Sequence, residues 1–354
     1  MAVGNKTMAD RTPPERKPDR KRGQILWTAV LILLPILCAA ASLCIGRIGI
    51  SPADVLRSIR GHLTGGEAVS LMIESTLWRI RFPRILLALL TGAGLSAAGC
   101  AFQSLFANPL ATPDTLGVAS GSSFGAALGL LLGLRLIGVQ IMALAFGGIA
   151  VLLTVLCGGG RNKRGLSGVV LAGIMMGSLF NALISFVKYM ADTETQLPSI
   201  TYWLMGTLGS AGYRELALGA PPILLGIALL LLLRWRLNLL PLSEDEIRSA
   251  GVNAGLLRGC VIVCATLVTA SSVSMCGQVG WVGLLIPHIC RMRFGSDHRK
   301  LLPASVLLGA AFLTVVDTAA RSISPADLPI SILTAMVGAP FFIFLMRRTE
   351  GWRL

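Results

Sequence analysis

Few side chains in this sequence combine the type and the spacing that chemistry requires. Asp317 and Arg321 lie four residues apart with the acid first, which is the favourable order for an ion pair along a helix. Both stand close to apolar stretches, where an ionisable residue is a candidate for proton transfer. Because each charge has a partner at hand, we favour a structural pair, in which Asp317 positions Arg321, over a proton relay.

Metal and hydrolytic chemistry lack their usual patterns. His288 follows Pro287, but the only other histidines are His62 and His298, so we expect His288 to be structural and to bond nearby backbone. The eight cysteines include no CxxC pair. The sequence contains no HExxH or GxxxxGK[ST] motif. We therefore predict no catalytic residues, no metal site and no cofactor bound by this chain, which is not itself an ATPase.

A polar segment at 237–258 interrupts the apolar sequence. Ser243 is followed by the acids Glu244, Asp245 and Glu246, which is typical of a helix N-terminus with a serine cap. Gly251, after Ala250, ends this helix, and Asn253 is expected to cap a second short helix. Such a pair of short helices can either transmit a push or serve as a solvated connector.

Arginines cluster in WRIRFPR, which contains Arg79, Arg81 and Arg84. The rigid guanidinium fork suits pairing with carboxylates. The alternative is that these side chains extend to lipid headgroups, as arginines near helix ends often do. Arg321 belongs with this cluster if the chain places both on the same side of a membrane.

The composition indicates a membrane protein. The 354 residues are 54% hydrophobic and 14% charged, with a mean hydropathy of +0.75, whereas soluble domains carry about 25% charged residues. A net charge of +14 could suggest nucleic-acid binding. However, Lys and Arg gather at the ends of apolar runs and aromatic stacking platforms are missing, so we predict no nucleic-acid partner.

Ten apolar runs are candidates for membrane spans. They cover 26–46, 84–105, 118–134, 137–157, 168–190, 217–234, 257–277, 281–292, 302–320 and 328–346. The bias of basic residues places both termini of this multi-pass protein in the cytoplasm. The predicted parts are a basic cytoplasmic tail at 1–25, which is attracted to the anionic inner leaflet, a transmembrane domain at 26–348 and a cytoplasmic C-terminus at 349–354.

Glycine and proline break the spans in two similar blocks. Residues 91–124 and 269–295 each read as a small-residue helix, a broken turn and a short glycine-rich helix; Gly283 and Pro287 belong to the second block. Non-helical backbone is tolerated in a bilayer only where protein or a water-lined path covers it. The fold class is therefore all-α, with about ten transmembrane helices and an inverted repeat of spans 2–5 and 7–10. Pro109, in NPLATPD, ends span 2 either in a plain turn or in a gate.

Blocks along the whole chain after residue 25 resemble one protein family in order. They include RIRFPR at 79–84, FANPLATPDTLGVASG at 106–121, LNLLPLSEDEIRSAGVN at 237–253, GQVGWVGLLIPHICRMRFG at 277–295 and DTAAR at 317–321. The sequence is similar to the FecCD-type, BtuC-like permease subunits of type II ATP-binding-cassette importers, which handle iron–siderophores, haem and vitamin B12.

The resemblance implies partners and roles for these blocks. It implies a homodimer, or a pair with a paralogous permease, in a lipid membrane, two ATPase subunits that bind ATP-Mg, and an extracytoplasmic substrate-binding protein. The implied ATPase-coupling residues are Ser243, Glu244, Asp245, Glu246, Ala250, Gly251 and Asn253. The implied docking residues for the binding protein are Arg81, Arg84 and Arg321. Asn108 and Leu110 would gate the pathway near the dimer axis with Leu166 and Ser167, and spans 5 and 10 would line it. Pro109, Gly283, Pro287, His288 and Asp317 would be structural.

We therefore expect a permease in the cell's inner or plasma membrane that imports an iron–siderophore or related metal chelate by alternating access. The same machine carrying haem or vitamin B12 is the alternative. A proton-coupled secondary transporter is a rival of another class, but it normally requires carboxylates at mid-membrane, where only Asp317 comes close.

Overall fold

The computed structural model describes residues 19–65, 69–159, 165–209, 212–324 and 327–348, and every regular element in those ranges is helical. The first set is α1 (Asp19–Cys44), α2 (Pro52–Thr64), α3 (Leu71–Ser75), the π-helical η1 (Thr76–Arg81), α4 (Phe82–Leu105), the 3₁₀ turn η2 (Pro113–Leu116), α5 (Val118–Leu131), α6 (Leu136–Gly158) and α7 (Gly165–Met190). The second is α8 (Gln196–Leu204), α9 (Tyr213–Leu233), η3 (Arg236–Leu239), α10 (Glu244–Ser249), α11 (Ala254–Cys276), α12 (Val282–Phe294), α13 (His298–Ile323) and α14 (Ile330–Arg348).

Each of the ten predicted spans falls on a helix. Seven spans within the described residues are long and apolar enough to cross a membrane by length and composition. Two further spans coincide with the shorter apolar helices α5 and α14, and the last with α12. Helix α1 begins at Asp19, inside the segment predicted as a tail. The rest of that tail and the C-terminus at 349–354 lie outside the described residues.

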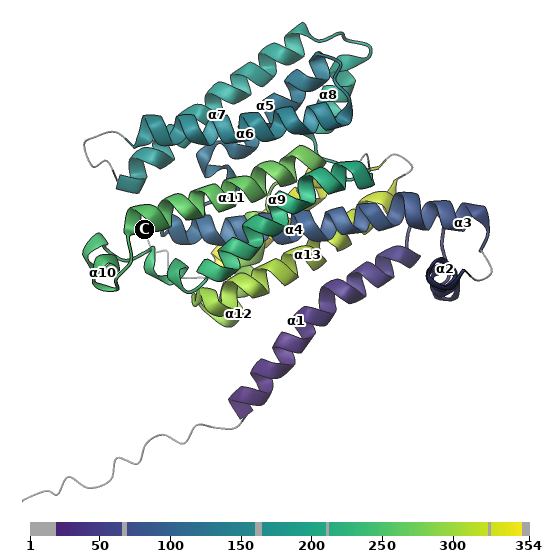
Figure 1. Cartoon of the computed structure of the whole chain (residues 1–354), viewed down its shortest axis with the longest axis horizontal. Coiled ribbons are helices and arrows are strands. Elements are labelled where there is room, and N and C mark those ends of the chain that lie inside the picture. The colour runs from purple at the N-terminus through teal and green to yellow at the C-terminus, as the bar shows by residue number, and fades with distance from the viewer. Residues whose placement is uncertain (1–18, 66–68, 160–164, 210–211, 325–326, 349–354) are drawn as a thin grey trace, which may run out of the picture.

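The long helices run roughly along one direction in stacked layers (Figure 1). Helices α5, α6, α7 and α8 form the upper layer in that view, α11, α9 and α4 the middle one, and α12 and α13 the lower one. Helix α10 lies at one end of the bundle and α2 with α3 at the other (Figure 1). We call these the α10 end and the α2 end.

Helix α4 is the centre of the molecule. In its span, 83% of the apolar window is buried, against 22% in α7. Small residues allow this close packing, because a Cβ on Gly99 would collide with the backbone carbonyl of Gly283 in α12. Helices α9, α11, α12 and α13 all pack against α4. The core therefore surrounds α4, and α7 keeps an open face.

The two halves share one local pattern, as the predicted repeat requires. A long helix is followed by a turn and a short helix in both: 24 and 14 residues for α4 and α5, and 23 and 13 for α11 and α12. Each short helix begins after a residue with positive φ, Gly117 at 74° and Trp281 at 69°. Such a φ is rare for a residue other than glycine and marks a sharp, over-determined turn.

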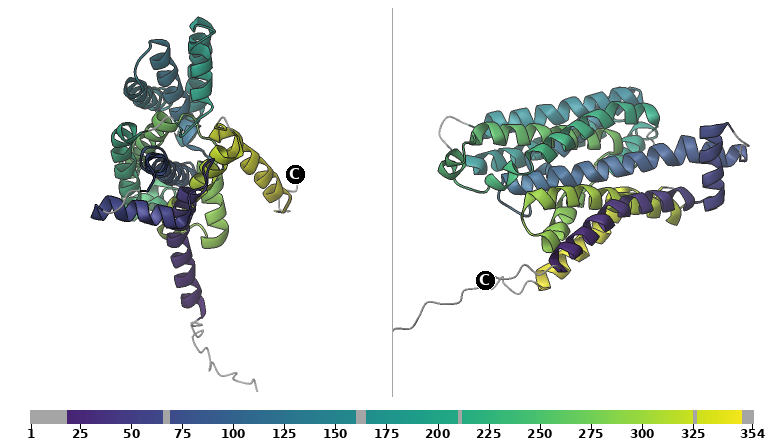
Figure 2. Two further views of the ribbon diagram at one scale, coloured as in Figure 1. Left: turned by 90° about the vertical axis from the view of Figure 1, so that its right-hand side faces the viewer. Right: turned by 60° about the horizontal axis from the view of Figure 1, so that its bottom comes forward.

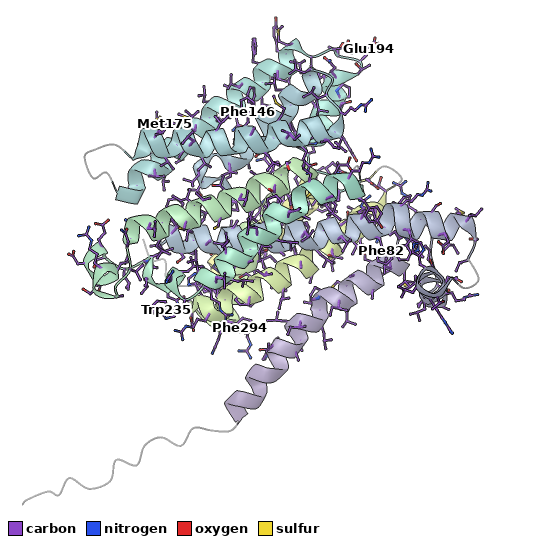
Figure 3. The ribbon with its side chains drawn as sticks, in the orientation of Figure 1. Phe82, Phe146, Met175, Glu194, Trp235 and Phe294 are labelled. Carbon is purple, nitrogen blue, oxygen red and sulfur yellow. The ribbon has the colours of Figure 1, made fainter. Side chains whose placement is uncertain are left out.

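Helices α1 and α14 project from the bundle in different directions (Figure 2). Helix α1 packs mainly on α13, whereas α14 touches α12 and α13. Exposed apolar side chains remain on α7 and α14, among them Met175, Leu179 and Met336. Met175 lies on the side of α7 that faces away from α11 (Figure 3). These faces suit lipid or a second protein surface.

Candidate coupling, gating and docking sites

Helix α10 begins with a capping box. The Ser243 hydroxyl accepts from the Glu246 backbone N–H at 3.4 Å, and a Glu246 carboxylate oxygen accepts from the Ser243 N–H at 2.9 Å and from its hydroxyl at 2.8 Å. The hydrogen bonds that Glu246 accepts lower the pKa of its exposed carboxyl below the ordinary value, and the bond from the Ser243 backbone N–H has the largest effect. The predicted cap at Ser243 is therefore present.

The same helix is held to α11. Ile247 is fully buried, and Arg258 of α11 donates to Glu244 at 3.2 Å. Gly251 turns the chain with φ 73°. Asn253 accepts from the Leu256 N–H at 3.0 Å and caps the long helix α11, not the second short helix that the sequence suggested. Asp245 and Ala250 remain exposed.

Sequence reasoning missed a polar cluster around η3, the turn that precedes α10 in the chain. Asn238, in η3, accepts from the backbone N–H of His298 at 2.9 Å and lies 2.8 Å from its ring Nδ1. Its amide donates to Asp297 at 3.0 Å. Ser104, at the end of α4, donates to the Leu237 carbonyl at 2.6 Å. The start of the polar segment at 237–258 is thus bonded to the end of α4 and the beginning of α13.

The cluster continues along α4 to α12. Arg291 donates to the side-chain carbonyl of buried Gln103 at 2.8 Å, and the Gln103 amide donates to the Gly283 carbonyl at 3.4 Å. The backbone carbonyl of Gln103 accepts a hydrogen bond from the backbone N–H of Asn108 at 3.1 Å. Polar residues on three distant segments can be read as one network only in the folded chain. In the sequence, the only sign of this network is that its polar residues stand at or near the ends of apolar runs.

The predicted gate loop follows directly. Helix α4 ends at Leu105, Ala107 has φ 48°, and Asn108, Pro109 and Leu110 are exposed. The Asn108 side chain accepts from the Leu110 N–H at 2.9 Å, which fixes an Asx turn. Leu166 and Ser167 lie in the first turn of α7, where Ser167 is exposed and the Leu166 side chain is outside the described residues.

A network of charges joins α4 and α13 to the loop after α1 and the loop before α14. Arg84 donates to Asp317 at 2.8 Å and to Asp327 at 2.6 Å, and Arg47 contacts Asp327 at 3.2 Å. The predicted Asp317–Arg321 pair is present but longer, at 3.8 Å. The nearest cation to Asp317 is therefore Arg84, which the sequence did not indicate.

The three arginines predicted to dock a partner are buried, whereas docking residues are expected to be exposed. Arg81 is 3% exposed, Arg84 6% and Arg321 7%. Arg81 donates to the Leu43 and Ile48 carbonyls, and Arg321 to the carbonyl and hydroxyl of Ser42. Their guanidinium groups are thus committed to internal partners in this conformation. Arg79, by contrast, is exposed.

His288 does not make the backbone bond expected at its ring. Its Nδ1 is buried and has no hydrogen-bond partner among the described residues. The ring packs instead against Phe342 of α14, with centroids 5.5 Å apart. Pro287 is buried in α12. Within the described residues, no cluster of three or more His, Cys, Asp or Glu side chains could hold a metal ion.

The described residues thus combine membrane-length helices, a capped surface helix and a break in the chain after α4. The FecCD transport family matches residues 32–348. The chain is 41% identical to the molybdate import system permease protein MolB of Haemophilus influenzae, over 90% of this chain and 95% of that protein. It is 38% identical to a probable iron chelatin transport system permease protein of Helicobacter pylori (84% and 90%), and 35% identical to the vitamin B12 import system permease protein BtuC of Salmonella typhi (93% and 97%).

A solved structure, described as "an inward-facing conformation of a putative metal-chelate type ABC transporter", matches with a TM-score of 0.82 and 39% identity, covering 92% of this chain and 99% of that one. The chain therefore belongs to the FecCD transport family and is the permease of an ABC importer.

Proposed function

We propose that the protein imports an iron–siderophore or related metal chelate by alternating access. The family match over residues 32–348 carries the importer class. The iron chelatin relative and the metal-chelate transporter structure support this cargo. Charged residues among the described side chains of α7 and α14 stand only at helix ends, Lys188 and Arg347. A pathway lined in this way binds its cargo weakly.

We assign the α10 end to the cytoplasm and α10 to the contact with a separate ATPase subunit. The supporting observation is a rigid exposed helix, capped by Ser243 and anchored by Ile247 and Arg258. Movement of α10 would reach the gate loop through Asn238, Ser104 and the end of α4. Asn108 and Leu110 would close the pathway at the axis of a homodimer, or of a pair with a paralogous permease.

We assign the α2 end to the binding protein. Arg47 and Arg79 are exposed there and offer charge to carboxylates. Arg81, Arg84 and Arg321 would contribute from inside the network, where a partner's carboxylate could replace Asp327 beside Arg84. The alternative for Arg79 is contact with lipid headgroups.

Molybdate is the second candidate cargo, because the MolB relative is 41% identical over nearly its whole length. Haem and vitamin B12 remain alternatives in the same class of importer, and BtuC supports the latter.

The test is uptake into proteoliposomes that contain this chain, its ATPase and its binding protein. Ferric siderophore, molybdate, haem and cobalamin are offered in turn. We expect ATP-dependent uptake of ferric siderophore, which falls at least tenfold in the combined variant Glu244→Gln, Asp245→Asn, Glu246→Gln. The control is Glu194→Gln, which neutralises an exposed acid far from α10 (Figure 3).

Each alternative has its own result in this experiment. Uptake of molybdate in place of siderophore would contradict the proposed cargo but not the assignment of the protein as an importer permease. Uptake that persists with a hydrolysis-deficient ATPase would instead support a secondary transporter. Uptake that is unchanged in the combined variant would show that these acids of α10 are not needed for coupling.

The variant Asn238→Leu tests the link between η3 and α13. The ATPase subunit should still hydrolyse ATP, but most uptake should be lost, because leucine cannot make the hydrogen bonds of Asn238 to Asp297 and His298.

A further inference from the structure

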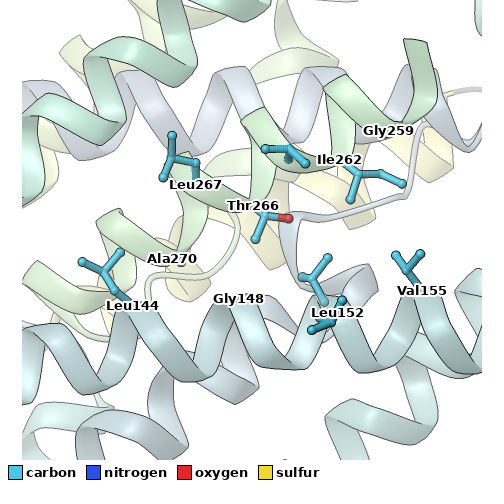
Figure 4. Close-up of a pocket in the computed structure, with 11 residues that line it drawn as sticks. Leu144, Gly148, Leu152, Val155, Gly259, Ile262, Thr266, Leu267 and Ala270 are labelled. Carbon is cyan, nitrogen blue, oxygen red and sulfur yellow. The ribbon is translucent and has the colours of Figure 1, made fainter. Parts of the chain in front are cut away.

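A groove of about 440 Å³ lies between α6 and α11 (Figure 4). It joins the upper layer of the bundle to the middle layer, and so the first predicted repeat to the second. Its walls are glycines and apolar side chains, with Thr266 as the one polar side chain among the lining residues. The lining residues are Leu144, Gly148, Val151, Leu152, Val155, Gly259, Ile262, Val263, Thr266, Leu267 and Ala270.

The groove opens to the surroundings of the bundle. Leu152 is 58% exposed and Val263 is 65% exposed. A Cβ added to Gly148 or Gly259 would meet nothing within 4 Å. These two glycines therefore leave space that no other part of the described chain fills. In a membrane protein, such a lateral opening between two spans faces lipid.

The dimensions select the occupant. From Leu144 to Val155 the groove follows eleven residue steps of helix, which at 1.5 Å each is about 16 Å. One leaflet of a bilayer has about half of a 30 Å hydrocarbon core. The length of the groove therefore matches one acyl chain, whose hydrocarbon occupies one leaflet.

Charge marks one mouth of the groove. Arg258 precedes the lining residue Gly259 at the α10 end and contacts Glu244 of α10. Its Nε is buried and has no hydrogen-bond partner among the described residues. A cation at the interface attracts the phosphate of a headgroup. We propose that this groove binds one acyl chain of a phospholipid from the leaflet at the α10 end, with its headgroup beside Arg258.

The lining has one polar side-chain group, the Thr266 hydroxyl, and its lack of a partner favours an acyl chain over a polar ligand as the occupant of the groove. Thr266 is 9% exposed, and its hydroxyl has no partner among the described residues. A ligand with its own polar group at that depth would bond to this hydroxyl, whereas an acyl chain would not. The isosteric variant Thr266→Val therefore separates the two kinds of occupant.

The test uses the full chain reconstituted in liposomes that contain a phospholipid with a photoactivatable diazirine in one acyl chain. Crosslinks are mapped by peptide mass spectrometry. We expect labelling concentrated in 144–155 and 259–270. In Gly148→Leu with Gly259→Leu this labelling should fall at least fivefold, because leucine fills the groove. The control Ala40→Leu adds the same bulk at an exposed position on α1 and should change nothing.

Other results contradict the proposal. Equal labelling of α1, α9 and the groove, or labelling that survives filling, would show ordinary lipid contact only. Loss of labelling in Thr266→Val would show that binding depends on this hydroxyl, which contradicts occupation by an acyl chain at that depth. If the double variant does not fold, Val263→Trp at an exposed lining position replaces it. Because neither the ATPase nor cargo is present, failure here leaves the transport proposal untouched.

Discussion

At the scale of residues, Arg84 makes two ion pairs at once, and both connect distant parts of the described chain. It joins Asp317 of α13 to Asp327, just before α14, and both contacts are within 3 Å. Asp317 is almost completely buried. A buried carboxylate without its cation is costly, because the desolvation of the charge is no longer offset.

We predict that Arg84→Gln lowers the free energy of unfolding by about 3 kcal/mol or more. The measurement is denaturant unfolding in mixed micelles. The matched control is Arg79→Gln, which removes an exposed arginine five residues away and should change the stability little. Equal stability of the two variants would show that the network contributes nothing to folding. Adding Asp317→Asn to Arg84→Gln should recover part of the loss.

At the scale of elements, α10 is a helix of six residues that cannot be stable on its own. Its capping box and its anchors to α11 must maintain it. The carboxyl of Glu246 accepts two hydrogen bonds from Ser243, and these lower its pKa. Because the folded pKa is lowered, the stabilisation is present above the ordinary pKa of 4.5 and is lost as the pH falls through the lowered value.

We predict that Ser243→Ala weakens the local stability of α10 by about 1 kcal/mol. This corresponds to roughly fivefold faster exchange of the Ile247 and Ala250 amides, which donate to the Ser243 and Glu246 carbonyls. The control Ser249→Ala removes a hydroxyl that bonds only the Asp245 carbonyl, and it should leave that exchange nearly unchanged. After correction for intrinsic exchange, protection in the unmodified protein should be constant from pH 5 to 8. A loss of protection within that range would contradict the assignment of Glu246.

At the scale of the whole molecule, α7 and α14 have open faces, and the loop at Asn108 that we propose as a gate is exposed. These surfaces suit contact with lipid or with a second protein. A dimer whose axis passes the gate would place two copies of Asn108 close together. A disulfide requires Cα atoms within about 7 Å, so it is a strict test of this geometry.

We predict that Asn108→Cys forms a covalent dimer on oxidation in native membranes when the gate is closed. The background carries Cys157→Ser and Cys260→Ser, since these native cysteines are exposed. Arg57→Cys, at the α2 end, is the control and should remain monomeric on gels. Crosslinking at both positions would point to random collisions, and crosslinking at neither would place Asn108 away from the axis.

The sequence by itself determined the membrane class, the ten helical spans and the local caps. These features depend on composition and on neighbours three or four residues apart, so Ser243 with Glu246 could be recognised directly. The tertiary structure alone decided which distant groups meet. It paired Arg84 with Asp317 and Asp327, joined Asn238 to His298, and left a groove between α6 and α11. It also buried the three arginines expected at the surface. These contacts depend on how helices that are distant in the sequence pack in the folded bundle, and the spacing of neighbouring residues does not predict that packing.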